Sequence, residues 1–235
     1  MNGCKPPMLV KLSATRWLSF HGAVSTHLSQ YNVLQTYFHG FVADVKDPKD
    51  VCPTLKKLSD MHSDYRNLLM LTFLKPVLEK ITIQNVLFQK TNADLTKAFT
   101  DLRVFVFSMA RRVLKENALV QSAQPGVLRR SELEALRCTL ENKEKLRPLE
   151  MVDYGEAFKD LSRRMLQARQ ITEEQLRQIQ AYCANYLVRL CKELAARLPD
   201  CISEIENLRF FTPNRVLAKR GRPTFDQLPL HLIRK

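Results

Sequence analysis

Apolar residues recur every three or four positions along most of this chain, which is the spacing that one face of an α-helix requires. The first pattern predicts a helix that starts near Ser13 or Thr15, either of which could cap its first turn. We expect it to end near His39, because Gly40 suits a helix C-terminus. Two prolines and two aspartates then predict a loop over residues 45–53.

A second pattern of helical spacing runs from Leu55 to Thr72. Pro76 lies where the pattern continues, and it predicts a break or kink, because proline lacks an amide proton and clashes with the preceding turn. The stretch "ITIQNVLF" at 81–88 is ambiguous between helix and strand, and nothing in the chain clearly favours a strand.

The clearest helical pattern lies between residues 91 and 117, with Thr91 and Asp94 placed like a capping box at its start. The sequence "SAQPGVLRR" predicts a loop over 122–130, and the charged segment 131–148 predicts a helix that ends near its proline. The predicted buried stripe of the clearest helix consists of Leu95, Ala98, Phe99, Leu102, Phe105 or Val106, Met109 and Val113.

Two more helices are predicted in the C-terminal half, the first over residues 153–170. Thr172 and Gln175 form a second capping-box pattern, and they open a long helix that ends before Pro199. The predicted apolar face of this long helix carries Leu176, Ile179, Cys183, Leu187, Leu190 and Leu194.

The patterns together predict a mainly α protein with one multi-helix domain over residues 13–208. A short leader, 1–12, precedes this domain, and Asp200 is expected to cap a short helix that closes it near Leu208. An irregular basic segment with three prolines follows at 209–235.

The chain is basic, with a formal net charge of +13 and a pI of about 9.6. Residues 1–117 have 16 Lys and Arg against 9 Asp and Glu, and residues 118–235 have 21 against 15, so the excess is spread over both halves. This favours a polyanionic partner, with nucleic acid ahead of an anionic membrane surface. The alternative is a basic protein without such a partner.

The sequence carries few signs of catalysis, of a cofactor or of a membrane span. It lacks a P-loop and the common hydrolase motifs, and its six cysteines form no C-x-x-C pair, so we expect neither an enzyme nor a metal site nor a cofactor. The apolar run at 68–74 is far shorter than the ~20 residues that a membrane span needs. No signal peptide is recognisable at residues 1–11, which favours the nucleus or the cytoplasm.

The stretch "LSATRWLSF" contains the one tryptophan of the chain, Trp17, directly after Arg16. A Trp ring can stack on an unpaired base, and the neighbouring guanidinium can hold a phosphate. The alternative is a Trp that fills the core at the start of an amphipathic helix.

Two further groups of basic residues are candidates for DNA binding. Arg111 and Arg112 lie at the end of the clearest helix, where basic residues also suit the helix dipole. The stretch "AKRGRPTF" contains an Arg-Gly-Arg core that can enter a narrow minor groove, although so short a match also arises by chance. The candidate residues in this stretch are Lys219, Arg220 and Arg222.

Three segments in order resemble the hAT superfamily of transposases and the host proteins derived from them. These are "TRWLS" at 15–19, the "FL-x-PVL…N-x-LFQ" pattern within 68–102, and "RFFTPNRV" at 209–216, which together span most of the chain. In that family an all-helical insertion domain interrupts an RNase H-like core that holds two Asp and one Glu. The resemblance implies that Trp17, with Arg16 beside it, stacks on a base flipped out near a cleaved DNA end.

The resemblance also shows what this chain lacks. The segments that would carry the catalytic Asp and Glu residues and the zinc-binding BED finger have no counterpart in it. We therefore expect a detached or truncated insertion domain without transposase or nuclease activity.

The expected function is that of a non-catalytic DNA- or chromatin-associated protein of the nucleus, derived from a hAT transposase. The alternative is a helical protein–protein interaction module, nuclear or cytoplasmic, that has lost DNA binding. Its partner would cover the surface that faces the catalytic core in the family.

Overall fold

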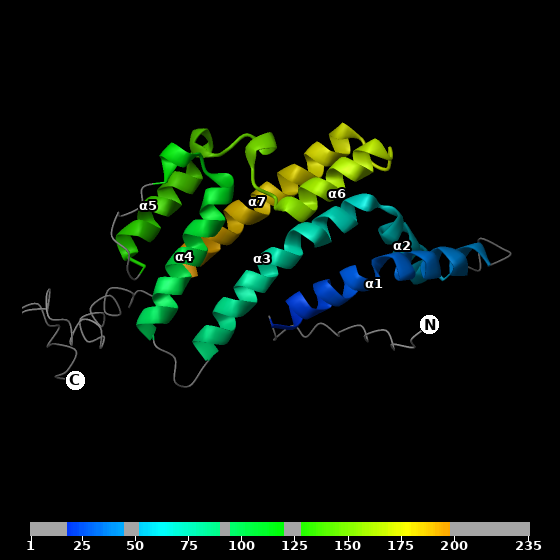
Figure 1. The fold of residues 1–235 in the computed structure, drawn as a ribbon, viewed down its shortest axis with the longest axis horizontal. Coiled ribbons are helices and arrows are strands. Elements are labelled where there is room, and N and C mark those ends of the chain that lie inside the picture. Colours follow the sequence, from blue (N-terminus) through cyan, green and yellow to red (C-terminus); the bar gives the residue numbers. More distant parts are fainter. Residues whose placement is uncertain (1–17, 45–51, 90–94, 120–127, 198–235) are drawn as a thin grey trace, which may run out of the picture. The chain divides into compact units, whose positions relative to one another are not determined.

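The computed structural model describes residues 18–44, 52–89, 95–119 and 128–197. Within these ranges the chain is mainly helical and has no strand beyond one isolated bridge, which confirms the predicted fold class (Figure 1). The α-helices are α1 (Leu18–Ala43), α2 (Pro53–Ser63), α3 (Tyr65–Gln89), α4 (Leu95–Val113), α5 (Arg130–Glu141), α6 (Glu156–Gln167) and α7 (Glu173–Arg197).

The chain divides into two compact units, and the division falls inside two of the helices. Unit 1 comprises Met1–Ile83 and Tyr154–Cys183, so it contains α1, α2, α6 and the first parts of α3 and α7. Unit 2 comprises Gln84–Asp153 and Ala184–Lys235, with α4, α5 and the remaining parts of α3 and α7. This division is finer than the single helical domain expected over 13–208, whose outer bounds lie outside the described residues.

The core of unit 1 forms around Phe73 of α3, whose side chain is fully buried. Its ring lies with its centroid 6.5 Å from the rings of both Tyr154 and Phe158, and those two rings are 5.0 Å apart. The sulfur of Cys183 in α7 lies 3.9 Å from that of Met70 in α3. Packed aromatic rings and soft sulfur atoms thus join α3, α6 and α7.

α1 and α2 pack together around a buried histidine, His62, which is 3% exposed. The rings of His27, Tyr31 and Phe38 on α1 each lie 5.1 Å from its ring. The Tyr31 hydroxyl and the Gln35 amide donate hydrogen bonds of 3.2 Å and 2.8 Å to the His62 carbonyl oxygen. Burial, and after it the nearby His62, lowers the pKa of His27, so the neutral form of the His27 imidazole is favoured.

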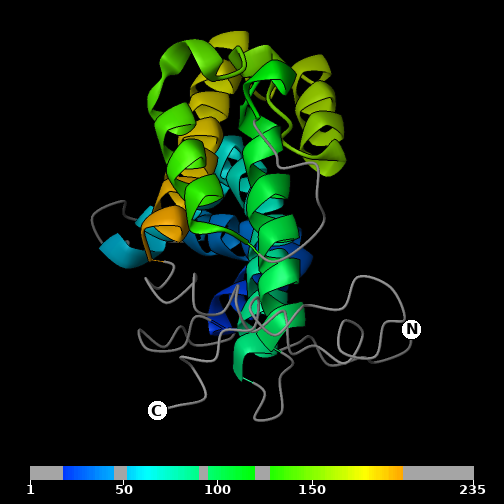
Figure 2. The same ribbon diagram turned by 90° about the vertical axis from the view of Figure 1, so that its left-hand side faces the viewer.

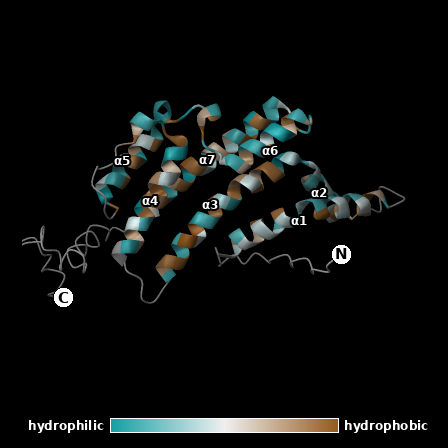
Figure 3. Ribbon diagram, in the orientation of Figure 1, coloured by the Kyte–Doolittle hydropathy of each residue, from teal (hydrophilic) through white to brown (hydrophobic). Residues whose placement is uncertain are grey.

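The core of unit 2 is built on α4, and Figures 1 and 2 show α5 beside this helix. Figure 3 shows hydrophobic and hydrophilic residues alternating along α4, as expected for an amphipathic helix. Phe107 of α4 is buried, and it lines a small pocket together with Leu136 of α5. The predicted stripe of α4 is confirmed wherever its side chains are described, because all of these residues are buried: Ala98, Phe99, Leu102, Phe105, Val106, Met109 and Val113.

A buried ion pair also joins α4 to α5. The guanidinium of Arg103 donates hydrogen bonds of 2.7 Å and 3.0 Å to the two carboxylate oxygens of Glu132, and the side chains are only 12% and 7% exposed. Glu132 also accepts a hydrogen bond from the backbone amide of Arg129, which caps α5. Burial alone raises the pKa of Glu132, but the hydrogen bonds from Arg103 and Arg129 and the charges of both arginines outweigh it, so the pKa is lowered.

The prediction that α1 ends near His39 is wrong, because the helix continues through Gly40 to Ala43. Gly40 lies inside the helix, where its carbonyl oxygen accepts a hydrogen bond of 2.9 Å from the amide of Asp44. The ring of Phe41 packs near that of Tyr37, with centroids 5.8 Å apart. A glycine ends a helix only where the backbone turns left-handed, and here the backbone stays helical.

Of the break or kink predicted at Pro76, the break is wrong, because α3 runs on through the proline as far as Gln89. The side chains of Phe73 and Val77, on either side of the proline, are fully buried. Their burial favours the helix by about 1.5–3 kcal/mol each, which offsets the ~3 kcal/mol that an interior proline costs. The break occurs at Asp64, whose carboxylate accepts a hydrogen bond of 3.0 Å from the amide of Arg66 and caps α3.

The capping box of the long C-terminal helix is confirmed. The amide of Thr172 donates to the Gln175 side chain at 2.9 Å, and the amide of Gln175 donates to the Thr172 hydroxyl at 3.2 Å. The residues predicted on the apolar face of α7 are buried or half-buried throughout. Several expected features lie outside the described residues: the start of the first helix, most of the loop at 45–53, the capping box at Thr91, most of the loop at 122–130, and everything after Arg197.

Replacing Glu132 by alanine is expected to lower the free energy of unfolding by about 3 kcal/mol at pH 7, because it leaves the Arg103 charge buried without its partner. The double variant Arg103→Leu/Glu132→Leu should lose clearly less. Since the pKa of Glu132 is lower in the folded state, its stabilisation is present above the unfolded pKa of about 4.3 and is lost as pH falls below it.

Urea unfolding at pH 7 and pH 3.5 measures both effects. An equal loss for the single and the double variant would contradict the ion-pair argument.

Candidate nucleic-acid interface

The C-terminal end of α4 is held by a segment more than 30 residues further along the chain. The backbone amide of Asp153 donates to the Arg112 carbonyl oxygen at 3.0 Å, and that of Arg147 donates to the Val113 carbonyl oxygen at 2.8 Å. The Arg147 guanidinium donates to the carbonyl oxygen of Leu114 at 2.7 Å. The last carbonyl groups of an α-helix have no partner inside the helix, and here segment 145–153 supplies donors for them.

Residues 145–147 pair with residues 113–115 through one isolated antiparallel β-bridge. Leu114 and Leu146 form the bridge, and the amide of Lys115 donates to the carbonyl oxygen of Lys145 at 3.0 Å. Leu114 is fully buried below this bridge. The backbone hydrogen bond between Lys115 and Lys145 brings these two residues next to each other, and both side chains are exposed.

Four exposed basic residues gather at this end of unit 2, and we call them the basic patch. Lys115 and Lys145 form its centre, Arg111 lies one helical turn before Lys115, and Lys143 precedes Lys145 in the short 3₁₀ helix Lys143–Lys145. Within the described part of the chain, neither Lys115 nor Lys145 forms an ion pair, although Glu116 and Glu144 are their neighbours in sequence.

The two arginines predicted at this end of α4 have different environments. Arg111 is exposed and belongs to the basic patch. The side chain of Arg112 is only 11% exposed, its Nε donates to the Asp153 carbonyl oxygen at 2.7 Å, and it lies 3.9 Å from the Asp153 carboxylate. Arg112 thus fastens Asp153 to the end of α4, whereas Arg111 lies exposed at the surface.

The other predicted DNA-binding residues lie outside the described residues. These are Arg16 and Trp17 before α1, and Lys219, Arg220 and Arg222 near the C-terminus. The sequence analysis missed the contribution of Lys143 and Lys145, because they lie about 30 residues from Arg111 in a segment without clear periodicity. The signal that could have found them was the short run "NKEKLR", in which every second residue from Lys143 is basic.

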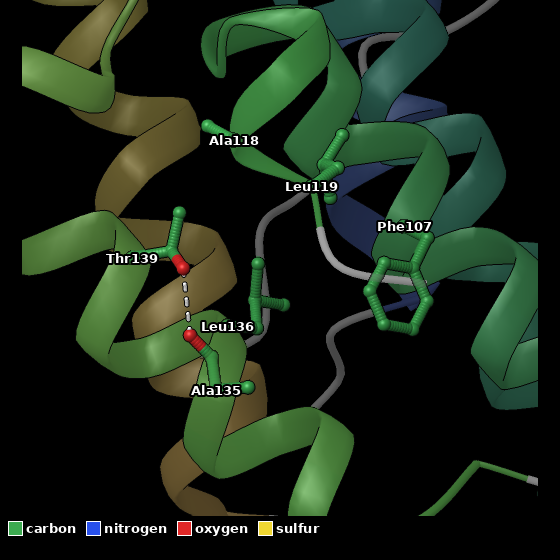
Figure 4. A pocket seen from close by; sticks show the side chains of 6 residues that line it. All are labelled: Phe107, Ala118, Leu119, Ala135, Leu136 and Thr139. Atoms are coloured by element: carbon green, nitrogen blue, oxygen red, sulfur yellow. Dashed lines mark hydrogen bonds between the residues drawn. The ribbon is translucent and has the colours of Figure 1, made fainter. Parts of the chain in front are cut away.

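A small pocket lies between the end of α4 and α5 (Figure 4). Phe107, Ala118, Leu119, Ala135, Leu136 and Thr139 line it, and the Thr139 hydroxyl donates to the Ala135 carbonyl oxygen at 2.8 Å. It has room for about one water molecule. This pocket is too small and too apolar for a substrate or a cofactor.

In the four described ranges no group of three or more His, Cys, Asp or Glu residues is placed to hold a metal ion. Across the same ranges, no helix combines the length and apolar character needed to cross a membrane. No protein-family model, curated protein or solved structure matches this chain.

Replacing Arg147 by alanine is expected to lower the free energy of unfolding of unit 2 by about 2 kcal/mol, because the Leu114 carbonyl group loses a charged donor. Lys145→Ala is the matched control, since its exposed side chain holds no such contact, and it should change stability by less than about 0.5 kcal/mol. Urea titration followed by circular dichroism measures both. Similar losses in the two variants would contradict the role of Arg147.

Proposed function

We propose that this protein binds double-stranded nucleic acid, DNA in the first place, through the basic patch of unit 2, and that it does so without catalysing a reaction. The observation that carries the proposal is the backbone contact that brings the exposed residues Lys115 and Lys145 next to each other. Like charges held close together repel each other. A phosphate group bound between the two ammonium groups would relieve that repulsion.

The surroundings of the two lysines support a phosphate partner. Arg111 adds a guanidinium, which forms paired hydrogen bonds with phosphate oxygens. Lys143 extends the positive charge along the same edge. The net charge of +13 also draws polyanions to the protein before any specific contact is made. Contacts of this kind recognise the phosphate backbone and carry little sequence information.

The resemblance of the sequence to hAT transposases supplies the origin in this proposal. We propose that the protein is a non-catalytic nuclear protein derived from such a transposase, with Arg16 and Trp17 as a second contact to DNA. Trp17 would hold an unstacked base, while the basic patch would bind the phosphate backbone of a duplex.

A protein-interaction module is the second candidate function, and one observation favours it. The outer side of α1 exposes Val33, Tyr37 and Phe41, which are 71%, 57% and 48% exposed. Apolar side chains gathered on one helix face are typical of a protein contact.

Neutralising the patch tests the first candidate. The triple variant Arg111→Gln/Lys115→Gln/Lys145→Gln is expected to bind a 20-base-pair duplex at least tenfold more weakly at low salt. The slope of log K against log[salt] should become shallower by about 3, because three phosphate contacts no longer release counterions. Fluorescence anisotropy at several salt concentrations measures both quantities.

The control variant is Lys56→Gln/Lys57→Gln/Lys80→Gln, which removes the same charge from exposed positions on α2 and α3. It should leave the slope nearly unchanged. If both triple variants lose affinity equally, binding depends on net charge alone and the basic patch is not the site. If only the control loses affinity, the site lies in unit 1.

Trp17→Ala is expected to bind a hairpin or mismatched DNA about tenfold more weakly and a fully paired duplex almost as well, because stacking on an unpaired base is worth about 1–3 kcal/mol. Trp17→Phe keeps an aromatic ring and should retain most of the preference. The same anisotropy assay applies, after circular dichroism has shown that both variants fold. A uniform loss on all DNAs would remove Trp17 as a base platform.

A further inference from the structure

We propose that two copies of this chain associate through the outer face of α1, with the two helices antiparallel. This interface is separate from the DNA contact proposed above and does not depend on it. Four properties of α1 lead to the proposal: its lack of charge, its exposed apolar side chains, two glycines without a packing role among the described residues, and a residue pattern that matches itself in reverse.

α1 contains no Asp, Glu, Lys or Arg in its 26 residues. Charged residues make up 26% of the chain, and at that frequency a helix of this length would contain about seven. Two chains that each carry +13 repel one another, and this repulsion is weakest where they meet over uncharged surface. A copy of the same chain can therefore approach α1 more easily than it can approach the basic patch.

The side of α1 that faces away from α2 exposes apolar residues. The buried side holds Val24 and Tyr31, which are 7% and 3% exposed. Val33, Tyr37 and Phe41 lie on the outer side at successive helical turns, with exposed fractions of 71%, 57% and 48%. Such side chains are the usual anchors of a protein interface, since aromatic residues are enriched there.

Two glycines lie inside α1 where no described residue of their own chain gives a packing reason for them. A Cβ atom added at Gly22 or at Gly40 would meet no atom of the described residues within 4 Å. Each glycine nevertheless costs the helix about 1 kcal/mol relative to alanine. The two are 18 residues apart, which is five full turns, so they lie on the same side of the helix. Missing side chains on one outer side allow another helix to come close.

The glycines and two threonines of this outer side are placed symmetrically about position 31. Gly22 and Gly40 are each nine residues from it, and Thr26 and Thr36 are each five residues from it. A two-fold axis at that point would place Gly22 against Gly40 of the second copy and Thr26 against Thr36 of the second copy. Self-complementarity of this kind is what a two-fold interface requires, and it favours a second copy over an unrelated partner.

The antiparallel arrangement also places both aromatic side chains beside a small residue of the second copy. Phe41 of one copy comes opposite His21 of the other, beside the gap at Gly22, and Tyr37 comes opposite Ser25, next to Thr26. Large residues facing small ones let two helices interdigitate without voids. The seam from Gly22 to Gly40 is roughly 27 Å long, which corresponds to a weak interface rather than an obligate one.

Sedimentation velocity of the full chain between about 1 and 100 µM, in ~0.5 M salt, tests the proposal. The wild type should pass from monomer to dimer across this range. Val33→Glu should weaken the dimer at least tenfold, because it places two carboxylates close to the two-fold axis. Val104→Glu is the matched control, since Val104 on α4 is 64% exposed and outside α1, and it should leave association unchanged.

Two leucine substitutions separate association from folding. Leucine forms helices better than glycine, so Gly22→Leu and Gly40→Leu should preserve or raise the helical content in circular dichroism. Both should nevertheless weaken the dimer at least tenfold, because they fill the gap between the helices. Loss of association together with loss of helix would overturn this explanation.

A charge pair tests the direction of pairing. Gly22→Lys and Gly40→Glu should each weaken the dimer, and the double variant should recover most of the lost affinity, since Lys at 22 then faces Glu at 40 of the second copy. The two positions are too far apart to interact within one helix. A parallel pair would place like charges together, and the double variant would then be the weakest of the three. A wild type that stays monomeric at 100 µM overturns the proposal as a whole, without bearing on DNA binding by the basic patch.

Discussion

The last carbonyl groups of α4 need hydrogen-bond donors from outside the helix, and unit 2 is organised around this requirement. No donor inside the helix can reach them, so the chain returns more than 30 residues later and supplies Arg147 and the amide of Asp153. The same return pairs Leu114 with Leu146 and closes the core over them. As a consequence, Lys115 and Lys145 are brought next to each other, so the candidate site results from the hydrogen bonds that complete a helix end.

The two units differ in the kind of surface that they offer. Unit 2 gathers cations at one end, where a phosphate backbone would be bound by charge and by hydrogen bonds. α1 in unit 1 has no charged side chain of the Asp, Glu, Lys or Arg type and exposes apolar residues instead. The positive charge of the first surface attracts polyanions, whereas the uncharged second surface does not repel another copy of this basic chain. A dimer formed through α1 would carry two basic patches, and the second patch would then meet a bound polyanion at a raised effective concentration.

The errors of the sequence analysis have a common cause. The helix end expected at Gly40 and the break or kink expected at Pro76 rest on the local free-energy cost of these residues inside a helix. That cost is about 1 kcal/mol for glycine and ~3 kcal/mol for proline. Both residues lie inside helices, and at Pro76 the neighbouring residues gain more free energy from packing than the backbone loses. At Pro76 that gain is the burial of Phe73 and Val77. Asp64 ends α2 because its carboxylate caps the next helix, a role that local periodicity does not reveal.

The sequence by itself determined the helical class, the buried stripe of α4 and the capping box at Thr172, because these depend on residues within a few turns of one another. It also placed Arg111 and Arg112 at a helix end. Only the tertiary structure decided which of the two is exposed, since Asp153 engages Arg112 from 41 residues away. The pairing of Lys115 with Lys145 depends on the tertiary structure for the same reason: hydrogen bonds between distant segments, and not local spacing, bring these charges together.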